Sequence, residues 1–236
     1  MLRSLFLLLV GCATGVTAAA TDIRPIQSWA DYRLALTEDG SSDEEADAEI
    51  AAALGSLNRM DRAAGDDLIG SAALPFRFDA WLDGPALTLE SLRGRVVLVR
   101  WWTDTCPFCA SSAPALRTLQ AEYADRGLQV IGVFHPKAGR DDPLDVDRVR
   151  RAVQARQFTF PIAIDWHWRT GTLHDWWLSG PERPATSVTF ILDKQGVIRF
   201  IHPGMEYHDP NGAAQHAVCA NDMGRIRAVI ERLAAE

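Results

Sequence analysis

The spacing of hydrophobic positions changes several times along the chain, and each change predicts a new element. Val96–Val99 is an uninterrupted apolar run, which is typical of a buried strand in a parallel sheet. The residues from Pro107 to Gly127 carry apolar side chains at helical spacing, and Gly127 is a helix stop signal. Residues 128–134 then predict a second strand. A strand followed by a helix and another strand is typical of an α/β domain whose sheet is covered by helices on both faces.

The second half of the chain continues this alternation. Residues 146–153 predict a helix, and residues 158–164 predict an extended segment. Residues 187–193 and 197–201 predict the two strands of a β-hairpin. The apolar residues of a C-terminal helix recur at steps of three and four: Cys219, Met223, Ile226, Ile230 and Leu233. We therefore expect an α/β domain over residues 71–236, with a central mixed sheet flanked by helices.

Residues 21–70 differ from the rest of the chain. No basic residue occurs between Arg33 and Arg59, whereas the acidic residues crowd together there: Glu38, Asp39, Asp43, Glu44, Glu45, Asp47 and Glu49. Like charges at this density repel one another and favour an extended, hydrated segment. We expect an acidic linker or N-terminal extension, which serves either as a spacer above a membrane or as a plain solvated linker. Residues 50–60 favour a short helix within it.

The composition is that of an ordinary globular protein with one core and an appendage. The chain has 236 residues, of which 47% are hydrophobic and 23% are charged. Its formal net charge is −7 and it contains no basic run, which argues against nucleic acid as a partner. We expect a monomer that needs no cofactor.

The first twenty residues have the anatomy of a secretion signal, in which Arg3 precedes a short apolar stretch over residues 5–10. This stretch is too short to span a bilayer permanently. It ends at Gly11-Cys12, which resembles a bacterial lipobox in which Cys12 would carry the lipid. The alternative is ordinary cleavage near Ala18–Ala20. Under both interpretations residues 1–20 are a targeting segment, and the protein works in the periplasm or cell envelope, where disulfides persist.

The chemistry of the chain is concentrated in Cys106-Pro107-Phe108-Cys109, between the first long strand and the first helix of the domain. Cys106 falls at the N-cap and Pro107 at the first helical position, where a missing N–H costs nothing. The helix N-terminus favours a thiolate at Cys106, which lowers the pKa of this thiol and makes it a nucleophile. Cys109 lies one turn later and can resolve a mixed disulfide. Half of a zinc site and a structural cysteine pair are the alternatives, but no second C-x-x-C or H-x-x-x-H pair follows.

The order of elements, with C-x-x-C after the first central strand, resembles the thioredoxin fold, and more closely the TlpA/ResA-like branch of envelope thiol-disulfide oxidoreductases. The residues that carry the resemblance are Leu92–Val99, Trp101, Trp102, Cys106–Cys109, Pro114, Phe190–Asp193 and Gly196. The resemblance implies dithiol-disulfide exchange with envelope proteins that carry thiols or disulfides. It also implies that Cys106 is the exposed nucleophile and Cys109 the buried resolving thiol. The direction of electron flow stays open.

Two positions depart from the family pattern. Thioredoxins carry a buried acid six residues before the first cysteine, where this chain has Arg100. They also carry a cis-proline three residues before the position of Phe190, where this chain has Ser187. Arg100 cannot accept a proton, so we expect it to stabilise the Cys106 thiolate if it points toward the pair. The alternative is an arginine that is turned to the sheet edge and has a carboxylate partner. Arg100, Ser187, Pro107 and Trp102 are thus the candidate supporting residues of the cysteine pair.

A further candidate site is the loop that follows the hairpin. His202, Glu206 and His208 lie close together in the sequence, and with His216 or a thiol they offer borderline-soft metal ligands. A polar surface loop is the alternative. The remaining cysteine, Cys219, lies on the apolar stripe of the last helix, where cysteine usually behaves as a small hydrophobic residue.

Two other functions occur on this fold. A Sco-like copper-binding protein or chaperone would use Cys106 and Cys109 as soft metal ligands. A peroxiredoxin-like peroxidase is the second, but its usual proline and threonine ahead of the cysteine are not clearly present. The position of C-x-x-C between a strand and a helix favours the thiol-disulfide oxidoreductase.

Overall fold

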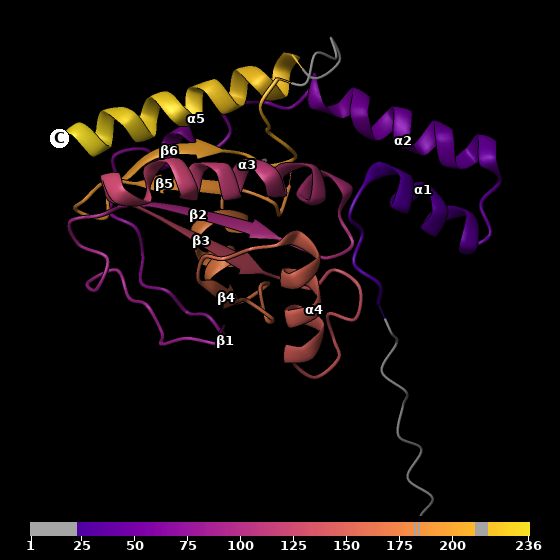
Figure 1. Cartoon of the computed structure of the whole chain (residues 1–236), viewed down its shortest axis with the longest axis horizontal. Helices are drawn as coiled ribbons and strands as arrows, with labels where there is room; N and C mark the ends of the chain where they lie inside the picture. The colour runs from indigo at the N-terminus through magenta and orange to yellow at the C-terminus, as the bar shows by residue number, and fades with distance from the viewer. Residues whose placement is uncertain (1–22, 182, 184, 211–216) are drawn as a thin grey trace, which may run out of the picture.

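The computed structural model describes residues 23–181, 183, 185–210 and 217–236 (Figure 1). Its centre is a six-stranded sheet in the order β1-β4-β3-β2-β5-β6. The strands are β1 (Ala80–Leu82), β2 (Val96–Trp102), β3 (Leu128–Phe134), β4 (Ile162–Ile164), β5 (Thr189–Leu192) and β6 (Ile198–His202). Strands β2, β3 and β4 are parallel, whereas β1 and the β5–β6 hairpin pair in antiparallel fashion. The expected mixed sheet is confirmed.

Among the described residues, the longer helices that accompany the sheet are α1 (Trp29–Glu38), α2 (Asp43–Leu57), α3 (Pro107–Tyr123), α4 (Val146–Arg156) and α5 (Ala217–Ala235). Three shorter ones are η1 (Asp66–Leu68), η2 (Ala124–Arg126) and the π-helix η3 (His174–Leu178). Helix α3 lies across the sheet and α5 runs along its β6 side (Figure 1). The helices predicted after Cys106, over residues 146–153 and at the C-terminus are all present.

The central strand β2 is buried on both faces because its residues alternate between two cores. Leu98 and Trp102 belong to one core, which they share with side chains of α3, α4 and α5. Val99 and Trp101 belong to the other, which is covered by the segment before β2 and by η3. The expected sheet flanked by helices is confirmed, and a tryptophan-rich π-helix together with loops covers the second face.

Helices α1 and α2 replace the extended acidic segment that charge repulsion predicts. A capping box begins α2, because the Ser42 hydroxyl accepts from the backbone N–H of Glu45 and the Glu45 carboxylate accepts from that of Ser42. Asp43 and Asp47 form ion pairs with Arg33 of α1. Acidic side chains in the first turn of α2 are also favoured by the helix dipole. These contacts offset the repulsion, so the expectation of an extended chain is wrong.

The predicted targeting segment over residues 1–20, which includes Cys12, lies outside the described residues, as does His216. Within the described part of the chain, no helix is both long enough and apolar enough to cross a bilayer.

Candidate redox site

Cys106 and Cys109 lie at the start of α3, and residues 103–105 separate Cys106 from the end of the central strand β2. Cys106 is the N-cap, with φ −110° and ψ 117°, and Pro107 is the first helical residue. Cys106 is half-buried, whereas Cys109 is only 3% exposed, and both are free thiols. A partner molecule can therefore approach the sulfur of Cys106 and not that of Cys109.

The two thiols form a hydrogen bond that shifts their pKa values in opposite directions. This bond, together with Arg100 and Arg156, lowers the pKa of Cys109 to about 6. The same hydrogen bond and burial raise the pKa of Cys106. The reduced pair thus shares one proton near neutral pH, and the negative charge belongs to the pair rather than to either sulfur alone.

The expected thiolate at Cys106 stays a prediction, because the pair shares its charge between the two sulfurs. The backbone N–H of Cys109, at the start of the helix, lowers the pKa of Cys106 as expected, but it is the weakest of the effects on that thiol. The two buried guanidinium groups of Arg100 and Arg156 act on Cys109 instead. Two kinds of charge therefore act on the shared thiolate: the helix N-terminus acts at Cys106, and the two buried guanidinium groups act at Cys109.

Arg100 is completely buried in β2. Its guanidinium donates hydrogen bonds to the carbonyl oxygens of Ser187 and Met205 and lies 5.2 Å from the ring centroid of Tyr207. None of the ion pairs among the described residues includes Arg100. Its charge is therefore not cancelled by a carboxylate at close range and acts on the thiolate of Cys109, as its contribution to the lowered pKa of that thiol indicates.

Ser187 lies just before β5 and is 7% exposed. Its carbonyl oxygen accepts from Arg100, and its hydroxyl accepts from the backbone N–H of Met205 at 3.2 Å. None of the peptide bonds in the described part of the chain is cis. The position at which the family pattern expects a cis-proline is thus a serine whose polar atoms join the loop after β6 to β2.

Trp102 ends β2 and belongs to the core. Its ring packs edge-on against Phe134 and Phe158, with centroids 5.2 Å and 5.3 Å away. The guanidinium of Arg156 lies 5.0 Å from the centroid of the Trp102 ring. Trp102 therefore supports the site by packing and by placing Arg156.

Three residues that the sequence analysis did not single out hold the link between β2 and Cys106. Asp104 is completely buried and forms a two-bonded ion pair with Arg148 of α4, at 2.6 Å and 2.9 Å. Arg156, two turns further along α4, donates to the carbonyl oxygens of Thr103 and Asp104. Arg148 lies within the helix predicted over residues 146–153 and was the available signal, whereas Arg156 lies beyond the predicted end of that helix.

The N-terminal extension contacts the same link. The backbone N–H of Ile26 donates to the carbonyl oxygen of Asp104 at 2.8 Å, and Arg156 donates to the carbonyl oxygen of Ile26 at 3.2 Å. The side chain of Ile26 is buried. The chain that leads into α1 is thus fixed beside the redox pair.

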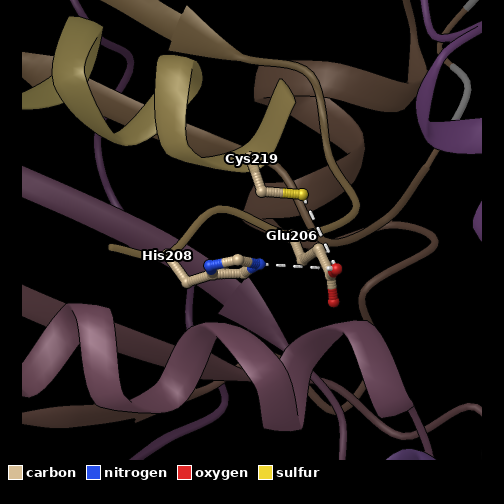
Figure 2. A group of neighbouring side chains, drawn as sticks. All are labelled: Glu206, His208 and Cys219. Atoms are coloured by element: carbon tan, nitrogen blue, oxygen red, sulfur yellow. Dashed lines mark hydrogen bonds and ion pairs between the residues drawn. The ribbon is translucent and has the colours of Figure 1, made fainter. Parts of the chain in front are cut away.

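The predicted metal ligands separate into two groups. His202 is buried, and its Nε2 lies 3.3 Å from a carboxylate oxygen of Asp222. Glu206 and His208 lie together with Cys219 instead, as Figure 2 shows. Among the described residues, neither Cys106 nor Cys109 belongs to a group of three histidine, cysteine or carboxylate ligands. The structure therefore gives the copper-binding alternative no further ligand at the cysteine pair.

A mixed sheet with a C-x-x-C pair after its central strand defines a protein of the thioredoxin-like class. Residues 68–216 match the model of the Redoxin family, so the chain belongs to that family. The fold also matches a solved thioredoxin-like superfamily protein, with a TM-score of 0.53 and 18% identity over 70% of this chain and 97% of that one. The expected thioredoxin fold is confirmed.

Two curated relatives carry informative names. Thioredoxin-like protein YneN of Bacillus subtilis is 35% identical over 123 residues, which are 52% of this chain and 65% of YneN. Thiol-disulfide oxidoreductase ResA of Halalkalibacterium halodurans is 31% identical over 84 residues, which are 36% of this chain and 44% of ResA. The chain thus spans less than two thirds of the length of each of these relatives.

Proposed function

We propose that this protein is a thiol-disulfide oxidoreductase that exchanges a Cys106–Cys109 dithiol or disulfide with partner proteins. The asymmetry of the pair carries the proposal, because a half-buried thiol and a buried thiol share one proton at the start of α3. The names of relatives such as ResA support the same reaction class.

The shared proton lets the exposed sulfur act as nucleophile. As Cys106 attacks one sulfur of a partner disulfide, its proton moves to Cys109, and the other partner sulfur leaves as a thiolate. Cys109 then loses its proton to solvent and attacks the Cys106 sulfur, which releases the second partner sulfur as a thiolate. Two electrons pass to the partner, and the Cys106–Cys109 disulfide forms. The reverse sequence oxidises a partner dithiol.

The test is trapping with a disulfide substrate such as insulin. Wild-type protein, reduced in advance, should reduce insulin, and Cys106→Ser should abolish this activity. Cys109→Ser should accumulate a mixed disulfide with one insulin chain, because no resolving thiol remains. The double variant Cys106→Ser/Cys109→Ser is the control and should trap nothing. Activity that persists in Cys106→Ser would contradict the proposal.

We also propose that the protein acts in the periplasm or cell envelope as a monomer, held to the membrane by a lipid on Cys12. The apolar stretch that ends at Gly11-Cys12 supports this, and residues 21–70 would then be the extension between anchor and domain. Wild type should sediment with membranes, and Cys12→Ser should not. A soluble wild-type protein that begins near Thr21 would instead indicate ordinary signal cleavage.

A further inference from the structure

Glu206, His208 and Cys219 bring three different ligand atoms to one place (Figure 2). Glu206 and His208 come from the loop after β6, and Cys219 comes from the beginning of α5. The Cys219 sulfur lies 3.6 Å from Oε1 of Glu206, and Nε2 of His208 lies 3.9 Å from the same oxygen. All three ligand atoms lie within 4.8 Å of one another.

These separations are close to those of a tetrahedral zinc centre. Zinc bonds of about 2.0–2.3 Å at tetrahedral angles place neighbouring ligand atoms roughly 3.3–3.8 Å apart. The separations from the Glu206 oxygen, 3.6 Å and 3.9 Å, lie within or just beyond this range, and the third separation is at most 4.8 Å. An ion at their centre therefore requires the group to contract by up to about 1 Å along the third separation.

The loop that carries two of the ligands is held in place on both sides of Glu206. The residue before it, Met205, donates its N–H to Ser187 and accepts from Arg100 at its carbonyl oxygen. The residue after it, Tyr207, donates its N–H to the hydroxyl of Ser112 at 3.2 Å. Because these partners belong to the domain core, the Glu206 carboxylate is positioned before any ion binds.

The ligand set selects a class of metal ion. Thiolate, imidazole and carboxylate together suit a borderline ion such as Zn²⁺, whereas Mg²⁺ and Ca²⁺ prefer oxygen ligands alone and Cu(I) prefers sulfur. The thiolate of Cys219 and the carboxylate of Glu206 carry two negative charges, which balance the charge of a divalent ion. Three protein ligands leave one coordination position open for water.

We propose that Oε1 of Glu206, Nε2 of His208 and Sγ of Cys219 bind one Zn²⁺ ion. Without the ion the Cys219 thiol donates to Glu206, so zinc binding releases this proton to solvent and replaces the S–H with a sulfur–zinc bond. The ion would join the loop after β6 to α5. It shares no ligand with the Cys106–Cys109 pair, so its presence and the proposed exchange activity are separate questions.

Cobalt is the spectroscopic probe, because a cobalt–thiolate bond absorbs light where aqueous Co²⁺ does not. Cys12→Ser protein is first oxidised so that Cys106 and Cys109 form a disulfide, which leaves Cys219 as its one reduced thiol. One equivalent of Co²⁺ should then produce sulfur-to-cobalt charge-transfer absorption, and Zn²⁺ should remove it. His208→Ala should weaken binding at least about tenfold, because the loss of a residue that only hydrogen-bonds to a metal ligand already lowers metal affinity by that factor.

Matched variants make the assignment specific. Cys219→Ser should abolish the charge-transfer absorption, and Glu206→Gln should weaken Zn²⁺ binding. His167→Ala is the control, because that imidazole is exposed and pairs with Asp79 elsewhere, and it should bind as the parent does. Zn²⁺ should also raise the melting temperature of the parent protein but not that of His208→Ala.

Two outcomes would overturn the proposal. One is the absence of charge-transfer absorption in a parent protein whose circular dichroism shows it to be folded. The other is unchanged Zn²⁺ affinity in His208→Ala. This variant keeps the test decisive if Cys219→Ser fails to fold, because the side chain of His208 is 12% exposed whereas Cys219 is completely buried.

Discussion

The indole ring of Trp29 stands edge-on to the ring of Phe108, with centroids 4.9 Å apart and planes at 87°. Trp29 begins α1 in the N-terminal extension, and Phe108 lies between the two cysteines of the redox pair. Tyr32, one turn further along α1, is also near the pair: burial, then Glu49, and also Cys106 raise the pKa of its phenol to about 12. Helix α1 therefore covers part of the approach to Cys106.

Removing this cover should expose the nucleophile. We expect Trp29→Ala to increase the rate at which iodoacetamide alkylates Cys106, measured by mass spectrometry of the reduced protein. The lost aromatic contact should lower the free energy of unfolding by about 0.5–1.5 kcal/mol. Leu34→Ala is the control, because Leu34 lies in the same helix but is 46% exposed, and it should leave the alkylation rate unchanged. An unchanged or lower rate in Trp29→Ala would show that α1 does not shield the thiol.

The sequence predicts the sheet and the position of the cysteine pair, but it does not predict that α1 covers part of the approach to Cys106. Val96–Val99 and the C-x-x-C motif are local patterns, and the burial of β2 and the N-cap position of Cys106 follow from them. The contact of Trp29 with Phe108 joins residues that are far apart in the chain. No local pattern encodes such a contact, and the acidic residues around Glu45 point toward an extended segment instead.

The exchange rate should depend on pH through the lowered pKa of Cys109. This pKa is about 6, below the ordinary value of 9.0, so the pair carries a thiolate above pH 6 and gains a second proton below it. We expect the rate of insulin reduction to be level above about pH 7 and to fall about tenfold per pH unit well below pH 6. A rate that keeps rising up to pH 9 would contradict this assignment.

The positive charge of Arg100 should contribute to the pH dependence of the exchange rate. Arg100→Met removes a positive charge that lowers the pKa of Cys109, so the profile should move to higher pH and the rate at pH 5 should fall by a further factor of roughly ten. Arg95→Met is the matched control, because Arg95 precedes the same strand but is exposed. The ultraviolet absorbance of the thiolate, followed against pH, provides a readout that does not depend on activity. An unmoved profile in Arg100→Met would exclude the electrostatic role.

Part of the candidate site could not be predicted from the sequence. The helix N-terminus is a local feature, and it correctly places Cys106 at the N-cap, but it does not reveal the two guanidinium groups that also act on the pair. These groups belong to Arg100 and Arg156, which lie on a strand and a helix that meet only in the folded protein. Glu206 and His208 were candidate ligands because they lie close together in the sequence. Their partner Cys219 lies on the following helix, and no sequence pattern relates it to the loop that carries them.

The buried ion pair between Asp104 and Arg148 should be costly to break. Arg148→Met leaves a completely buried carboxylate without its partner, and we expect the free energy of unfolding to fall by about 3–5 kcal/mol. Arg150→Met is the control on the same helix, because its pair with Asp83 is largely exposed and should be worth about 0–1 kcal/mol. Urea denaturation followed by circular dichroism measures both. Equal losses in the two variants would mean that Asp104 finds another partner or water.

Ser187 should stabilise the loop after β6 through its hydrogen bond with Met205, and its hydroxyl should take no part in the chemistry of the redox pair. Ser187→Ala removes the acceptor of the Met205 N–H but keeps the carbonyl oxygen to which Arg100 donates. We expect a loss of about 1 kcal/mol in the free energy of unfolding, with an unchanged pH profile of exchange. Ser111→Ala is the control, because its hydroxyl forms no hydrogen bond with a described residue, and it should cost nothing. A changed pH profile in Ser187→Ala would show that the hydroxyl acts on the thiols. An unchanged stability would show that solvent replaces its bond to Met205.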